Sequence, residues 1–293
     1  MDAADLRIFE AVARLGGMNR AAAELNTVQS NVTARIRLLE KELEAPLFRR
    51  HSRGVALTDA GRRLLPYATR IEHLLRDARS AVADDGHPKG TLTVGALETT
   101  AALRLSSHLS SYVAQFPKVD LILRTGTTQE LIDDVLDHRL EGAFVCGPVD
   151  HPDLEQSHAF REELAILTAP SIRTLDALFR EAEVRIVVLR AGCSYRRRLE
   201  DLLAKRGILN PRRLEFGSLE AIVGCVAAGL GVTLLPKSLV GAVTRDHDLV
   251  VHPLPKGEGR VDTIFIHRRD AYMSSALTAF LRRVCVPATA AAE

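Results

Sequence analysis

Apolar residues recur at helical spacing in two short segments near the N-terminus, with a tight polar break between them. Ala22 and Leu25 belong to the first segment, and Val32, Ile36 and Leu39 belong to the second. Residues three or four positions apart share one face of a helix, so both segments can pack on a third helix. The other face of the second segment carries Gln29, Ser30, Asn31 and Thr33. This pattern predicts a helix-turn-helix, although an ordinary helical hairpin with a solvated face would show the same spacing.

A basic β-hairpin is predicted directly after these helices. The segment Leu47–Gly61 has the pattern of two short strands, and Gly54 supplies the turn. Between Thr27 and Arg63 there are eight Lys or Arg and four Asp or Glu, whereas the whole chain carries a net charge of only +2. The positive charge is therefore concentrated where a wing would contact phosphate oxygens or the minor groove of DNA.

Residues 1–63 resemble the winged helix-turn-helix of LysR-type transcriptional regulators. The residues that carry the resemblance are Leu6, Phe9, Ala21, Ala22, Leu25, Gln29, Val32, Thr33, Ile36, Leu39, Glu40, Leu47, Phe48, Arg50, Leu57, Thr58, Ala60 and Gly61. The chain departs from the family pattern at Val28, Ser30 and Ala45, where the family usually has Ser, Pro or a small residue, and Gly. The first two departures bear on which bases are read, not on whether DNA is bound. The resemblance extends more weakly over the remaining chain.

The resemblance implies sequence-specific binding to double-stranded DNA. Side chains at the start of the second helix would approach base edges, where Gln29 suits adenine, and arginines would hold the phosphate backbone. The residues predicted to contact DNA are Asn19, Arg20, Gln29, Ser30, Asn31, Thr33, Arg35, Arg49, Arg50 and Arg53. A purely architectural DNA-binding protein is a further alternative, but it would leave about two hundred residues of the chain without a role.

A long helix is predicted from its N-cap Thr58 to about Ala83, with Pro66 bending it or weakening its start. Its apolar residues alternate by four and three, which is the spacing of a coiled-coil seam: Leu64, Ala68, Ile71, Leu75, Ala78 and Val82. Since the chain shows no second long seam, we expect a homodimer through this helix. The alternative is that the stripe docks on the chain's own body. In the resembling family this helix pairs two subunits antiparallel, and the expected assembly is a homotetramer.

Strands and helices alternate after the segment Asp84–Gly90, which reads as a hinge. The predicted strands are Leu92–Ala96, Asp120–Arg124, Gly142–Cys146, Arg185–Leu189, Leu214–Phe216, Val232–Leu235, Leu249–Pro253 and Thr263–His267. The predicted helices are Ala101–Gln115, Gln129–Leu140, Tyr195–Lys205, Leu219–Ala228 and Ser274–Val284. This alternation indicates an α/β architecture with mostly parallel sheets.

The resemblance implies that this α/β part is an effector domain of two Rossmann-like subdomains, similar to a periplasmic binding protein. The crossover strands would fall near Arg161–Leu167 and Ile264–Arg268. The expected domains are the winged helix-turn-helix at 1–58, the linker helix and hinge at 59–88, and the effector domain at 89–293. Subdomain I would comprise 89–161 and 268–293, and subdomain II would comprise 162–267.

Hydroxyl side chains follow the predicted strand ends, where α/β proteins bind ligands. Helix N-capping alone explains any single one of them, and the resemblance brings them to one cleft. We expect a small-molecule effector whose carboxylate or other anionic group meets these hydroxyls. The residues predicted to bind it are Glu98, Thr99, Thr100, Thr127, Thr128, Cys193, Ser194, Tyr195, Arg196 and Ser218. Glu98 argues against a multiply charged anion unless it points away, and Cys193 raises a redox-responsive alternative.

Other classes of function find little support in the sequence. The cysteines Cys146, Cys193, Cys225 and Cys285 are scattered without a Cys-x-x-Cys motif, so neither a metal nor another cofactor is expected. An α/β enzyme or solute-binding protein is the alternative of a different class, but no nucleophile elbow or phosphate loop occurs in the right context. Without a signal peptide or an apolar run of membrane-spanning length, we expect a cytoplasmic protein with no membrane partner. RNA polymerase is a further expected partner.

Overall fold

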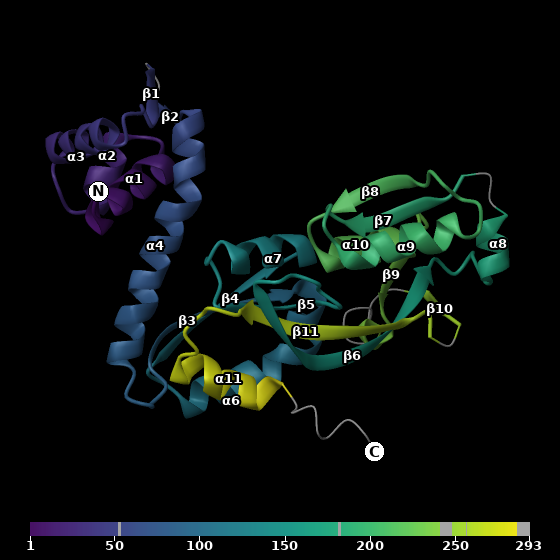
Figure 1. Cartoon of the computed structure of the whole chain (residues 1–293). Helices are drawn as coiled ribbons and strands as arrows, with labels where there is room; N and C mark the ends of the chain where they lie inside the picture. The colour runs from purple at the N-terminus through teal and green to yellow at the C-terminus, as the bar shows by residue number, and fades with distance from the viewer. Residues whose placement is uncertain (52–53, 181–182, 241–247, 256, 286–293) are drawn as a thin grey trace. The chain divides into compact units, whose positions relative to one another are not determined.

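The computed structural model describes residues 1–51, 54–180, 183–240, 248–255 and 257–285. Its chain forms two compact units, Met1–Asp85 and Gly86–Glu293 (Figure 1). The boundary between them lies in the segment Asp84–Gly90, which the sequence predicts as a hinge.

The first unit is a helical bundle with a two-stranded wing. Its elements are α1 (Ala3–Leu15), α2 (Met18–Glu24), α3 (Gln29–Glu42), β1 (Phe48–His51), β2 (Gly54–Leu57) and α4 (Asp59–Ala83). Phe9, Val32, Ile36 and Leu39 are buried in its core, as the apolar spacing predicts. Asn26, with φ of 51°, forms the turn between α2 and α3. The predicted helix-turn-helix with a wing is confirmed.

Short polar contacts fix the wing to the bundle. The backbone N–H groups of Leu47 and Phe48 donate to the Glu40 carboxylate at 2.7 and 3.2 Å. Thr58 caps α4 by accepting the Gly61 N–H at 3.0 Å. A Cβ at Gly61 would lie 2.3 Å from the Leu47 carbonyl oxygen, so only glycine lets α4 start this close to the hairpin.

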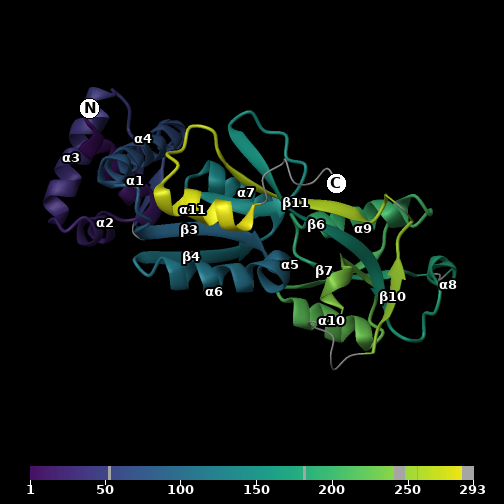
Figure 2. The same cartoon turned by 90° about the horizontal axis from the view of Figure 1, so that it is seen from below.

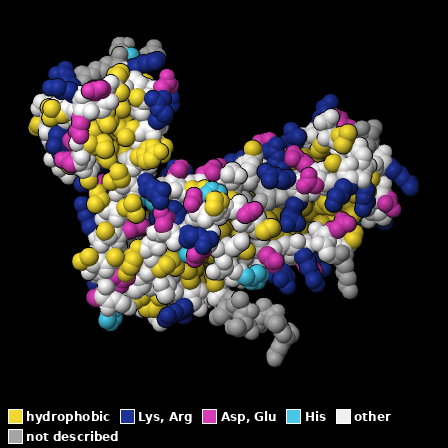
Figure 3. All heavy atoms as spheres, in the orientation of Figure 1, with side chains coloured by type: hydrophobic (Ala, Val, Ile, Leu, Met, Phe, Trp, Pro, Cys, Tyr) yellow, Lys and Arg dark blue, Asp and Glu magenta, His cyan; other side chains and the backbone are white. Residues whose placement is uncertain are grey.

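The apolar stripe of α4 divides into two halves. Ala68 is fully buried and, with Leu64 and Ile71, packs against the core of the first unit. Further along, Leu75 is half-buried, Ala78 is exposed and Val82 is 91% exposed, and hydrophobic side chains reach the surface along the helix (Figure 3). Docking on the chain's own body therefore accounts for the first half of the stripe and leaves the second half open.

The second unit contains two α/β lobes. In lobe I, the parallel strands β3 (Gly90–Leu97), β4 (Val119–Gly126) and β5 (Gly142–Cys146) are covered by α6 (Ser106–Gln115) and α11 (Ser275–Val284) on one face. The helix α7 (Thr128–Leu136) packs on the other face (Figure 2). Tyr112, Phe144, Phe265 and Phe280 are fully buried between the sheet and α6 and α11.

Lobe II has the same strand–helix order with a smaller sheet. Its elements are α8 (Leu175–Phe179), β7 (Arg185–Leu189), α9 (Ser194–Ala204), β8 (Arg212–Phe216), α10 (Leu219–Ala227), β9 (Thr233–Pro236), η2 (Lys237–Leu239) and β10 (Val250–Pro253). The strands β7 and β8 are parallel, and an isolated bridge between Ile186 and Val232 joins β7 to the segment before β9. The two predicted Rossmann-like subdomains are confirmed.

Two long crossover strands connect the lobes, and they correct the expectation of mostly parallel sheets. The strand β6 (Leu154–Thr168) leads from lobe I to lobe II, and β11 (Arg260–Arg268) leads back. Since they run in opposite senses, they pair antiparallel with each other, and β5, β9 and β10 also pair antiparallel with them. The crossovers occur where the sequence predicts them but are longer.

Two helices of lobe I differ from the prediction. The expected helix Ala101–Gln115 begins as the short turn α5 (Glu98–Thr100) and a π-helical segment, η1 (Ala101–Leu105), before α6. The helix α7 ends four residues early, because His138 adopts a left-handed backbone conformation with φ of 59°. The short helix α8 was not predicted. Every helix in the described part of the chain is too short or too polar to cross a membrane.

Candidate functional site

The first turn of α3 presents polar side chains to solvent. Gln29, Ser30 and Asn31 are exposed and Thr33 is half-buried. Gln29 donates to the Thr33 hydroxyl at 3.1 Å, and Asn31 donates to the Thr27 hydroxyl at 3.0 Å. The N-cap residue Val28 forms no side-chain capping bond, so the first N–H groups of this 14-residue helix stay open to an anion.

The arginines predicted to hold DNA differ in their surroundings. Arg49 is exposed on β1, and Asn19 and Arg20 are exposed on α2. Arg35 is ion-paired with Asp5 at 3.1 Å and lies 3.5 Å from Asp2, which ties α3 to the start of α1. Arg49 is therefore better placed than Arg35 to meet a phosphate. The side chain of Arg50 and all of Arg53 lie outside the described residues.

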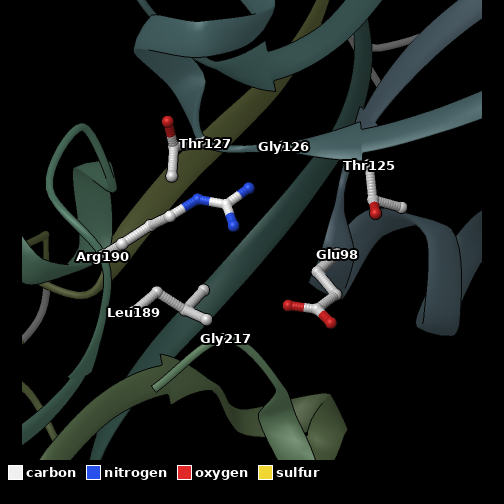
Figure 4. A pocket seen from close by; sticks show the side chains of 7 residues that line it. All are labelled: Glu98, Thr125, Gly126, Thr127, Leu189, Arg190 and Gly217. Atoms are coloured by element: carbon white, nitrogen blue, oxygen red, sulfur yellow. The ribbon is translucent and has the colours of Figure 1, made fainter. Parts of the chain in front are cut away.

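The second unit holds a cavity of about 100 Å³ at the carboxyl ends of strands from both lobes. Lobe I contributes Glu98, Thr125, Gly126 and Thr127, and lobe II contributes Leu189, Arg190 and Gly217 (Figure 4). A neighbouring cavity of about 20 Å³ adds Leu97, Thr99, Thr128, Cys193, Ser194 and Tyr195. Seven of the ten predicted effector residues thus line one or both cavities: Glu98, Thr99, Thr127, Thr128, Cys193, Ser194 and Tyr195.

Hydroxyl groups meet across the two lobes beside these cavities. The Ser194 hydroxyl donates to Thr128 Oγ1 at 2.9 Å, and the Thr99 and Tyr195 hydroxyls lie 3.5 Å apart. The backbone approaches closely at Gly192, whose φ is +92°, because a Cβ there would lie 2.7 Å from Thr127 Oγ1. The N-termini of α7 and α9 therefore come together at the cavity.

A positive and a negative side chain enter the larger cavity from opposite lobes. The Arg190 guanidinium pairs with Glu130 at 3.0 Å, and Glu130 also accepts the Thr127 N–H at 2.8 Å, which lowers the pKa of that carboxyl. Glu98 has no hydrogen bond or ion pair within the described chain. Burial, followed by the charge of Glu220, raises the pKa of Glu98, and the nearby Arg190 acts in the opposite direction.

Three predicted effector residues do not line either cavity. Thr100 is buried. Arg196 pairs with Glu200 at 3.2 Å and with Glu215 at 2.8 Å, so its charge is used within lobe II. Ser218 caps α10 by accepting the Ala221 N–H at 3.2 Å, the structural role that N-capping alone explains.

The sequence did not single out Arg190 and Leu189 as lining residues, whereas Thr125, Gly126 and Gly217 belong to strand-end segments that it indicates as ligand positions. Arg190 directly follows the correctly predicted strand Arg185–Leu189, so the rule that ligands collect at strand ends would have found it.

The cysteines do not favour redox chemistry. All four are free, and burial is the main cause that raises the pKa of both the Cys193 and the Cys146 thiol. A raised pKa suppresses the thiolate on which oxidation depends. The described residues also contain no group of His, Cys, Asp or Glu that could hold a metal ion.

Comparison with known proteins identifies the family. Residues 3–62 match the bacterial regulatory helix-turn-helix proteins of the lysR family, and residues 85–284 match the LysR substrate binding domain. The chain belongs to the LysR family of transcriptional regulators. It is a DNA-binding regulator with a helix-turn-helix and an effector-type substrate-binding domain, and this membership sets aside the enzyme alternative.

Related LysR-type proteins match over nearly their full length. The uncharacterised HTH-type transcriptional regulator YusT of Bacillus subtilis (strain 168) is 44% identical over 281 residues, covering 96% of this chain and 94% of YusT. A full-length OxyR variant from Pseudomonas aeruginosa superimposes with a TM-score of 0.70 at 19% identity, covering 97% of this chain and 96% of OxyR. Full-length CbnR in complex with its target DNA superimposes with a TM-score of 0.65 at 24% identity, covering 97% of this chain and 99% of CbnR.

Proposed function

We propose that this LysR regulator reads an operator through α3 and the wing, under the control of a small carboxylate-bearing effector bound in the cavity between its two lobes. The main support is that this cavity gathers hydroxyl groups and Arg190 from both lobes at the ends of their strands. A ligand that touches both lobes favours the arrangement in which they contact it together, and so shifts the conformational population.

Base reading is assigned to the exposed first turn of α3. Gln29 can bind adenine through its amide, because an amide offers one donor and one acceptor that match the N7 and N6 edge. Its present bond to Thr33 is a solvent-exposed one that DNA can replace. Arg49 on the wing, Asn19 and Arg20 on α2, and the N-terminus of α3 would contact phosphates. Such contacts position the protein without reading sequence.

Anion binding in the cavity is assigned to Arg190 and the nearby hydroxyls. Arg190 Nη2 donates to Glu130 at 3.1 Å, and Nε lies 3.0 Å from the other oxygen of that carboxylate. A guanidinium has five N–H donors, so others remain for a ligand. Thr125 also lines this cavity, and its hydroxyl can donate to a carboxylate, whereas the Thr127 hydroxyl caps α7.

Assembly is assigned to the open half of α4. Leu75 is half-buried there, Ala78 and Val82 are exposed, and burying this part of the stripe against a second copy would remove apolar surface from water. We propose a homodimer through α4 and a homotetramer built from two such pairs. The regulator would act in the cytoplasm, where bacterial DNA is accessible, and RNA polymerase is a further proposed partner.

The decisive experiment is a gel shift of the full chain on the DNA upstream of its own coding region. Gln29→Ala should lose about 1–3 kcal/mol of preference for its matched base pair while keeping its affinity for unrelated DNA. Arg49→Ala should weaken binding to all DNA sequences alike and reduce the dependence of binding on salt. Gln156→Ala, an exposed glutamine of β6, is the matched control. Binding that is indifferent to sequence in the wild-type protein would reject the proposal.

A further inference from the structure

The larger cavity is charged on two sides. Figure 4 shows the Glu98 carboxylate and the Arg190 guanidinium pointing into the space from opposite sides. Glu98 follows β3 of lobe I, and Arg190 follows β7 of lobe II. The cavity therefore offers one small ligand a carboxylate that can bind a positive group and a guanidinium that can bind a negative group.

The two charges are not equally satisfied in the structure. Arg190 already has an acidic partner in Glu130, at 3.0 Å. Glu98 is half-buried and lacks a hydrogen-bonding or ionic partner throughout the described residues, while Glu220 adds a second negative charge in its surroundings. A carboxylate that loses water without gaining a partner destabilises the protein. A cation in the cavity would remove this penalty.

Simple ligand classes leave one of these charges unmatched. A monocarboxylate would satisfy Arg190 and leave Glu98 alone, and a dicarboxylate would place its second negative charge near Glu98. An amine without an acid group would satisfy Glu98 only. A molecule with both groups matches the whole cavity, and the cavity's volume of about 100 Å³ requires it to be small.

We infer that the effector is a small zwitterion, a free α-amino acid, whose ammonium group binds Glu98 and whose carboxylate binds Arg190 and the Thr125 hydroxyl. This inference rests on the proposed function, because it takes the cavity as the effector site. It adds that Glu98 selects the effector by its positive group. It also explains how binding joins the lobes, since each lobe holds one charge of the ligand.

The test measures binding of the twenty standard L-α-amino acids to the full chain by thermal shift and then by calorimetry. Each amino acid that binds is compared with the acid that lacks the amine and with the amine that lacks the carboxylate, for example alanine with propionate and ethylamine. We expect an amino acid to bind roughly tenfold or more tightly than either analogue, because each loses one charge-assisted contact. The same amino acid should change the affinity for the upstream DNA.

Two variants test the assignment of the charges. Glu98→Gln should weaken the amino acid roughly tenfold or more, yet leave its deaminated acid unchanged or bound more tightly, because a repulsive charge is gone. Arg190→Gln should weaken both ligands. Asp120→Asn and Arg185→Gln, at the opposite ends of β4 and β7, are the matched controls and should change neither affinity.

The outcomes separate this inference from the proposed function. Should Glu98→Gln change the amino acid and its deaminated acid alike, Glu98 acts on lobe closure and not on the ammonium group, and the inference is wrong. If carboxylic acids bind through Arg190 without regard to Glu98, a carboxylate effector stands and the zwitterion is overturned. If no amino acid binds, the zwitterion is overturned too. Binding that both variants leave untouched would remove the cavity as the effector site and overturn both proposals.

Discussion

The exposed face of α3 and the cavity between the lobes both present polar side chains, under opposite conditions. Gln29 and Asn31 are exposed, and their hydrogen bonds to nearby threonine hydroxyls can be replaced by water without loss. Glu98 is partly withdrawn from water, and burial raises the pKa of its carboxyl. The exposed polar side chains of α3 therefore place little demand on the stability of the fold. The cavity holds a charge that the fold alone does not neutralise.

The largest expected effect lies on the buried side of α3. Ile36 is 1% exposed, so Ile36→Ala should lower the free energy of unfolding of the first unit by about 2–5 kcal/mol through lost burial and a cavity. Urea denaturation of the full chain, followed by far-UV circular dichroism, measures the change. Leu38→Ala is the control on the exposed side of the same helix and should stay within about 0.5 kcal/mol. Equal losses in both variants would contradict the packing of α3.

The next effect concerns a buried charge that does have a partner. Glu162 on β6 is only 6% exposed and accepts two bonds from Arg104, at 2.6 and 3.1 Å. Arg104→Ala should destabilise the second unit by about 3 kcal/mol, because it leaves the carboxylate buried with only the Ser238 hydroxyl. Arg104→Lys, which keeps the charge but loses the two-pronged contact, should recover part of the loss in thermal denaturation. If Arg104→Ala left the stability of the second unit unchanged, water would have replaced the guanidinium beside Glu162.

The pH dependence of stability tests the unmatched charge directly. The pKa of Glu98 in the folded chain lies above its ordinary value of 4.5, so the folded state holds this proton more tightly. The contribution of Glu98 to the free energy of unfolding is therefore most favourable below its unfolded pKa, where the carboxyl is protonated in both states. This contribution is lost as the pH rises through the folded pKa. Glu98→Gln should therefore be slightly more stable than the ligand-free wild-type protein at neutral pH, with the gap closing in acid. The difference in melting temperature between the two proteins, measured from neutral to acid pH, checks this. A difference that grows in acid would contradict the raised pKa of Glu98.

The smallest effect is expected at the exposed first turn of α3. Gln29→Ala and Asn31→Ala each remove one exposed hydrogen bond, so the free energy of unfolding should change by no more than about 0.5 kcal/mol. Chemical denaturation of the variants, with wild-type protein alongside, checks this. A loss beyond 1 kcal/mol, on the order of a missing helix cap, would mean that these side chains hold the start of α3 in place.

The fold was largely predictable because local patterns and tertiary packing agree. The apolar spacing of Val32, Ile36 and Leu39 defines the buried face of α3, and Gly142–Cys146 and Arg185–Leu189 are strands with the predicted bounds. The antiparallel pairing of β6 and β11 was missed, because the apolar content of a strand does not reveal the direction of its neighbour. The π-helical segment Ala101–Leu105 was missed too, because its apolar spacing does not differ from that of an ordinary helix.

The cavity was predictable only as far as strand ends determine it. Thr127 and Ser194 are hydroxyl residues at helix starts, and the two lobes bring them to one place. Arg196 also stands at a predicted helix start, but it forms ion pairs with Glu200 on the same helix and with Glu215 on β8. The spacing of Arg196 and Glu200 along one helix hints at the first of these pairs, whereas the contact with Glu215 depends on how the helix packs on β8.

Gly192 sets a limit on how the two lobes can move. Its lack of a side chain allows the loop after β7 to rest against Thr127, and a methyl group there would meet the threonine oxygen at 2.7 Å. A larger residue at this position would push the loop after β7 away from Thr127 and keep the two lobes further apart, with or without a ligand. Under the proposed function, a substitution at Gly192 would therefore weaken the response to the effector even though residue 192 does not line the cavity.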